Sequence, residues 1–140
     1  MASVLYNAFK KRLLDGNLNF GSDTIKVALV TSSYTPNIDT HDFFDDITNE
    51  ASGTGYTAGG ATLASAATSA DNTDDEGVFD AADVTWSSAS VAAAGAVIYK
   101  STGTASTSPL VGYVDFGTTY TSTSGNFVIT WNAEGIINIG

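Results

Sequence analysis

Residues 24–63 read TIKVALVTSSYTPNIDTHDFFDDITNEASGTGYTAGGATL, an apolar run followed at once by a long polar, acidic and glycine-rich segment. In residues 24–31 the odd-numbered Ile25, Val27 and Leu29 alternate with a second set that includes Lys26. This period of two predicts a β-strand with Lys26 on its wetter face. Residues 32–60 are long for a connection in a small domain, and such loops are usually functional or docked against a neighbour. Within them, residues 39–47 are expected to form a short helical turn that carries Phe43 and Phe44 inward.

The rest of the chain past residue 16 also reads as β-structure, because turn-forming residues interrupt every apolar run before a second long helix can develop. The further strands that we predict span 61–68, 78–86, 91–100, 110–116, 126–131 and 134–139. Turns are predicted between them over 87–90, 101–109 and 117–125. The last two are expected to form a hairpin in the core sheet, with Asn132 and Ala133 as its tight return. Seven short strands favour an all-β fold, a single antiparallel sandwich or barrel-like domain.

The N-terminal segment predicts a short amphipathic helix over residues 3–14. Leu5, Phe9 and Leu13 are spaced for one helical face, and the basic residues 10–12 lie near the C-terminal end, where cations suit the helix dipole. Ser3 is the candidate N-cap. We therefore divide the chain into a basic helix or docking arm, residues 1–16, and a β-domain, residues 17–140.

Composition limits the functions that this chain can perform. With 140 residues it is one ordinary domain, and its formal net charge of −10 argues against binding nucleic acid, which needs a basic surface. It has no cysteine, so disulfides and thiolate chemistry are unavailable. The N-terminus lacks the order of a signal peptide, and no apolar run approaches the length of a membrane span, so we expect a soluble protein without a membrane partner.

Several blocks of the sequence carry a resemblance to a known group of proteins. The clearest are residues 25–36 (IKVALVTSSYTP), 41–47 (HDFFDDI) and 53–63 (GTGYTAGGATL), with weaker likeness at 78–86, 95–100 and 127–131. In their residues and in their order along the chain, these blocks resemble small structural proteins of tailed-bacteriophage virions, and among these a capsid decoration or cement protein is the most similar. The likeness covers most of the chain.

That resemblance implies a non-enzymatic protein without cofactors, made in the host cytoplasm and carried on the capsid exterior. It implies the major capsid protein as partner, and lattice symmetry favours a homotrimer. A tail, neck or receptor-binding station in the virion is the alternative. The candidate contact residues are the helix and the paired phenylalanines of the long loop: Leu5, Phe9, Lys10, Lys11, Arg12, Leu13, Phe43 and Phe44. Both elements have a second interpretation, in which the helix covers one end of its own sandwich and the phenylalanines pack beneath their own loop.

The motifs that carry chemistry are weak. His41 is the sole histidine, and the carboxylates around it complete neither a zinc set nor a nucleophile and base pair. The glycine-rich residues 53–60 lack the Lys-Ser/Thr ending of a phosphate-binding loop, so their glycines are better explained by sharp turns or close backbone approach.

One acidic stretch imitates a calcium-binding loop. Counting from Asn72, oxygen ligands fall at positions 1, 3, 5, 9 and 12, namely Asn72, Asp74, Glu76, Asp80 and Asp83, with Gly77 at position 6. The last ligand is not the usual glutamate, and a strand is predicted where that loop requires a helix. An acidic solvated turn is the competing interpretation.

Aromatic residues offer a last alternative, a carbohydrate-binding β-sandwich module. An exposed aromatic row would support it, and burial of both tryptophans would count against it. The candidate rings are Trp86, Tyr99, Tyr113, Tyr120 and Trp131.

Overall fold

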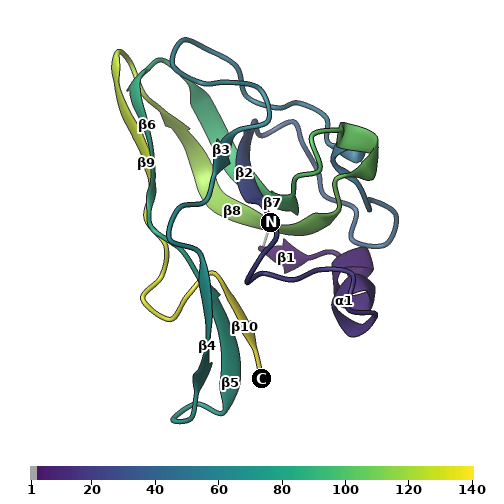
Figure 1. Ribbon diagram of the computed structural model, residues 1–140. Coiled ribbons are helices and arrows are strands. Elements are labelled where there is room, and N and C mark those ends of the chain that lie inside the picture. The colour runs from purple at the N-terminus through teal and green to yellow at the C-terminus, as the bar shows by residue number, and fades with distance from the viewer. Residues whose placement is uncertain (1–2) are drawn as a thin grey trace.

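The computed structural model describes residues 3–140 and is built around a five-stranded antiparallel sheet (Figure 1). The strand order is β1-β8-β7-β2-β3. The bounds are Val4–Leu5 for β1, Leu110–Thr121 for β8, Ala92–Lys100 for β7, Ile25–Val30 for β2 and Ala61–Thr62 for β3. The predicted all-β class is confirmed.

The two central strands, β2 and β7, form the middle of the core. They pair in register, with Val27 opposite Ile98, and almost every residue of both is buried. The expectation of a wetter face on β2 is wrong beyond Lys26, because Ala28 and Val30 on that face have no exposed surface. A strand covered on both faces tolerates small or branched apolar residues at every position, which is what this sequence supplies.

Two smaller sheets form a second layer, giving a sandwich-like arrangement. One has the order β10-β5-β4 (Ile137–Ile139, Glu76–Asp80 and Ala67–Asp71), and the other pairs β6 (Val84–Ala89) with β9 (Gly125–Ile129). In Figure 1 the β6 and β9 pair lies at the upper left and the other three strands extend downward from it. Phe79, Trp86 and Phe127 of this layer pack in the same hydrophobic core cluster as the buried residues of the large sheet.

The predicted hairpin over 126–139 is wrong. β9 pairs with β6 and β10 pairs with β5, so the two predicted partners do not pair with each other, and neither lies in the five-stranded sheet. The predicted strands 61–68 and 78–86 are each divided in two, and β8 continues to Thr121 through a stretch predicted as a turn. Alternation shows that a segment is extended, but it does not choose the partner strand.

The N-terminal helix, α1, spans Asn7–Leu14, and its N-cap is Tyr6, not Ser3. It starts late because Leu5 pairs with Gly112 in the sheet, while the Ser3 hydroxyl accepts a hydrogen bond from the Asp115 backbone N–H. Phe9 has 0% exposure. Its ring meets Phe20 edge-on at 5.8 Å, and Phe20 stacks on Phe79 of β5 at 4.3 Å, so the helix is tied to both layers.

Residues 32–60 contain no strand of the sheets, yet they form a packed cover over the large sheet. The predicted helical turn within 39–47 is present as the 3-10 turn η1, Phe44–Asp46, and a second one, η2, spans Ala105–Thr107. Tyr34 and Tyr56 are buried, and the Tyr56 hydroxyl accepts a hydrogen bond from the Leu29 backbone N–H in β2. This cover explains why both faces of β2 are dry.

Candidate functional site

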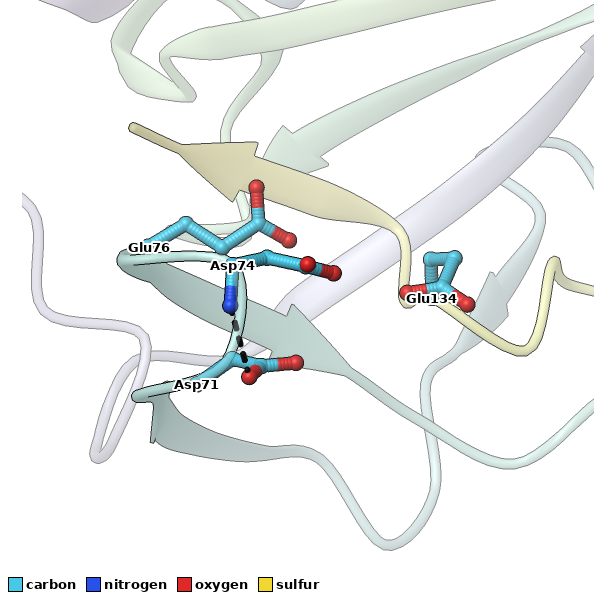
Figure 2. Close-up of side chains that lie close together, drawn as sticks. All are labelled: Asp71, Asp74, Glu76 and Glu134. Atoms are coloured by element: carbon cyan, nitrogen blue, oxygen red, sulfur yellow. Dashed lines mark hydrogen bonds between the residues drawn. The ribbon is translucent and has the colours of Figure 1, made fainter.

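Four carboxylates gather at the tip of the smaller three-stranded sheet. Figure 2 shows Asp71 at the end of β4, Asp74 in the turn, Glu76 at the start of β5 and Glu134 in the loop before β10. One oxygen from each lies within 4.8 Å of the others. The turn is ordered by Asp71 Oδ1, which accepts hydrogen bonds from the backbone N–H groups of Thr73 and Asp74 at 2.8 and 3.2 Å.

This cluster shares only Asp74 and Glu76 with the five predicted calcium ligands. Residues 76–80 form the strand β5, so no single calcium loop surrounds one point. Asp80 lies elsewhere on that strand, and Asp83 accepts a hydrogen bond from the Trp131 backbone N–H at 2.9 Å. The cluster gains Asp71 and Glu134 instead, and the second is brought in by the β10–β5 pairing, which local spacing does not reveal.

The cluster is chemically suited to a hard cation, but its own contacts also explain it. Carboxylate oxygens are the usual ligands of Ca²⁺. Glu76 already accepts a hydrogen bond from the Asn138 amide, Asp71 closes the turn, and Asp74 and Glu134 are exposed to solvent. Such contacts are typical of a solvated acidic turn, and the four carboxylates form a charged rim at the tip of the sheet.

Six of the eight predicted docking residues contribute to the chain's own packing, and Leu5 and Leu13 do so as partly buried side chains against the core. Arg12 lies over the Phe43 ring at 4.5 Å and donates a hydrogen bond to the Asp42 carbonyl at 3.1 Å. Phe44 stacks on Tyr99 of β7 at 4.1 Å, and Phe9 is wholly buried. The other four predicted residues hold the helix and the long loop to the body.

The outward edge of α1, formed by Lys10, Lys11 and Leu14, faces solvent instead of the body. Lys10 and Lys11 are exposed, and Leu13 on the same helix is partly buried, whereas Leu5 lies outside the helix, in β1. Leu14, which the helical spacing did not single out, is 89% exposed. The helix therefore presents Lys10 and Lys11 beside an apolar side chain, and Lys11 is paired with Asp15 at 2.6 Å.

His41 is the partly buried end of a hydrogen-bond chain that leads into the core. Its Nδ1 lies 2.9 Å from the Tyr34 hydroxyl, which lies 2.7 Å from the Tyr6 hydroxyl. Burial raises the pKa of Tyr34 to about 12 and raises the pKa of Tyr6 further. Asp46 accepts hydrogen bonds from the backbone N–H groups of Asp42 and Phe43, and the first of these is the main cause that lowers its pKa. This arrangement fixes the loop.

The glycine-rich residues 53–60 lie so close to neighbouring backbone that a side chain would not fit at Gly60, as the sequence predicted. Gly60 has φ +78°, and a Cβ there would lie 1.8 Å from the Val27 carbonyl oxygen. Glu50 Oε1 accepts hydrogen bonds from the Gly59 N–H at 2.6 Å and from the Tyr56 hydroxyl at 2.8 Å. The acidic side chain is thus engaged with the loop itself.

An uncharged groove of about 540 Å³ lies between β8, β9 and the loop that leads to β10. Its lining includes Phe116, Tyr120, Phe127 and Trp131. Two of these rings were among the five aromatic candidates, whereas Trp86, Tyr99 and Tyr113 are buried in the core. Phe116 and Phe127 were missed because their alternation reads as ordinary strand packing.

The sequence matches no family model, and no curated protein or solved structure is significantly similar to it. Among the described residues, no helix has the length and apolar character to cross a membrane.

Proposed function

We propose that this chain is a non-enzymatic virion structural protein, a capsid decoration or cement protein that binds the outside of the major capsid lattice. The observation that carries the proposal is the outward edge of α1, where Lys10, Lys11 and Leu14 are exposed on a protein of net charge −10. The block resemblance across most of the chain supports the same function.

The mechanism is adhesion by a rigid element. Because Phe9 and Arg12 fix the helix to the body, an exposed apolar side chain beside two cations can dock without the cost of ordering a free arm. Each contact is small, and repetition over the lattice supplies the strength, since linked weak contacts bind far more tightly than one. A trimer at a three-fold position of the lattice is the assembly that we propose.

The test starts with cryo-electron microscopy of the particle whose genome encodes this chain, with the protein located by a tag. Density repeated over the head lattice is the expected result. Density confined to the neck, tail or fibres would reject the decoration role and leave a virion role, and its absence from the particle would reject both.

A binding assay then tests the helix edge. The double variant Lys10→Ala and Lys11→Ala takes the net charge from −10 to −12, and it is expected to lower affinity for particles that lack the protein by about tenfold. The control, Ser106→Glu with Thr123→Glu, makes the same charge change at exposed positions away from α1. Equal loss in both variants would mean that net charge, and not the helix edge, governs binding.

A further inference from the structure

The uncharged groove has a floor and walls of aromatic rings. Phe127 is buried beneath it and Phe116 is half-buried, whereas Tyr120 on β8 is 55% exposed. Trp131 lies in the loop after β9 and is partly exposed. We propose that this groove is a binding site for a neutral oligosaccharide.

The rings are held in place before any ligand arrives. Phe116 meets Tyr120 at 6.3 Å with an interplanar angle of 70°, and it meets Phe127 at 6.3 Å. The Trp131 Nε1–H donates a hydrogen bond to the Ala82 carbonyl at 3.1 Å, and its backbone N–H donates to Asp83. A preorganised aromatic site loses little conformational entropy on binding.

The charge pattern selects the class of ligand. None of the described residues that line the groove carries a charge, although the chain has fifteen acidic residues. Phosphate and carboxylate ligands are most often held by Arg or Lys, and hard metal ions by carboxylates. A neutral ligand is therefore the one that these walls can hold without an unpaired charge.

The polar residues of the groove favour a ligand that carries hydroxyl groups. Asn126, Asn132 and Thr130 also line the groove, and they offer both donors and acceptors. Asn132 Oδ1 already accepts a hydrogen bond from the Glu134 N–H at 2.9 Å, whereas an apolar occupant that covered the exposed Asn126 and Thr130 would leave their polar groups unpaired, which costs free energy. A sugar ring has C–H faces that pack on aromatic rings and hydroxyls that exchange hydrogen bonds with amides, so it matches both parts of the lining.

The size of the groove also favours a small molecule over a protein. Its volume of about 540 Å³ is within the range of about 300–1,000 Å³ for sites that take small ligands. This function goes beyond capsid decoration, and it does not depend on it, because the groove and the outward edge of α1 lie on different elements.

The experiment screens the intact protein against an array of neutral oligosaccharides that covers the common hexose and N-acetylhexosamine linkages. Hits are then titrated by calorimetry. Binding of at least one neutral glycan is expected, and Tyr120→Ala is expected to weaken it by about threefold to tenfold through loss of one packed ring. Tyr120→Phe keeps the ring and should bind within about twofold of the original protein.

Ile139→Ala provides the control, because it removes a 48% exposed apolar side chain outside the groove. Binding to no glycan on the array would overturn the proposal, as would equal losses in Ile139→Ala and Tyr120→Ala. Sedimentation of the same proteins gives the third outcome: if the chain self-associates and Tyr120→Ala dissociates it, the groove is a contact between copies and the proposal is rejected. Particle binding, measured separately, reports on the decoration role alone.

Discussion

Residues 32–60 and the β4–β5 hairpin have similar polar, acidic sequences, but the structure packs them in opposite ways. The first segment has almost no regular structure, yet Tyr34, Phe44 and Tyr56 each reach the sheet or its cover. The hairpin is regular, yet four of the five β4 residues are exposed, and Phe79 is its one buried side chain.

The difference lies in a few aromatic anchors. Phe44 stacks on the Tyr99 ring, and Tyr34 and Tyr56 are buried with hydrogen-bond partners for their hydroxyl groups, so the irregular segment is buried where the regular hairpin is exposed. Tyr56 shows how: its ring is buried, while its hydroxyl accepts from Leu29 and donates to Glu50. A buried tyrosine thus provides apolar area and satisfies two neighbouring polar groups at once. The hairpin has no tyrosine.

Alkaline pH should have the largest effect on stability, because it ionises the buried tyrosines on which the packing of residues 32–60 depends. Burial raises the pKa of Tyr34 and of Tyr99 from the usual value near 10 to about 12, and it raises the pKa of Tyr56 as well. Because the folded-state pKa lies above the unfolded one, the stability from these groups is fully present below pH about 10 and is lost as pH rises toward 12. Circular dichroism recorded with tyrosinate absorbance should show unfolding together with ionisation. Ionisation at the pH of free tyrosine without loss of structure would contradict the packing of the loop.

Gly60→Ala should have the next largest effect. The new Cβ would overlap the Val27 carbonyl at a position with φ +78°, so we expect a loss of about 4 kcal/mol in the free energy of unfolding, or failure to fold. Gly103→Ala is the matched control, since its φ is +87° but nothing lies within 4 Å of the added Cβ. It should cost about 1 kcal/mol for the left-handed backbone alone. Urea denaturation measures both, and equal costs would mean that the close approach of residues 53–60 to β2 is not rigid.

The sequence anticipated the features that are local. The helix around Phe9, the strand 25–30 and the helical turn at Phe44 all follow from spacing within a few residues. It did not anticipate which strands pair, because residues 126–131 and 134–139 are both extended and only the β5 and β6 partners decide their place. Long-range pairing depends on the whole core.

The candidate sites follow the same rule. Asp74 and Glu76 were found because they are close in sequence, but Glu134 joins them only through the sheet. Tyr120 and Trp131 were noted as aromatic, whereas the groove that contains them needs β8 and β9 side by side. Spacing along the chain finds a turn, but it does not find a surface made from separate strands.

Tyr56→Phe tests how much one buried hydroxyl group contributes to the packing of residues 32–60 on β2. The ring stays, but the Leu29 N–H loses its acceptor and Glu50 loses a donor, so we expect a cost of about 2 kcal/mol. Tyr120→Phe, at an exposed position, should cost almost nothing. Hydrogen exchange of the Leu29 amide adds a local readout, because this amide should become less protected in the first variant only. Unchanged exchange would show that the hydroxyl does not hold the loop to β2.

Glu134→Gln should give the smallest effect, and the opposite sign. The cluster Asp71, Asp74, Glu76 and Glu134 places like charges near each other at the end of the weakly buried hairpin, so removing one should raise Tm by about 1–2 °C. Asp45→Asn makes the same charge change at an exposed site outside the cluster and should not raise it. Because exposed charges are screened, the gain should shrink in high sodium chloride. If calcium chloride raised the Tm of the unchanged protein more than sodium chloride of equal ionic strength, and Glu134→Gln abolished that rise, the carboxylates would be cation ligands and repulsion alone would no longer account for the hairpin.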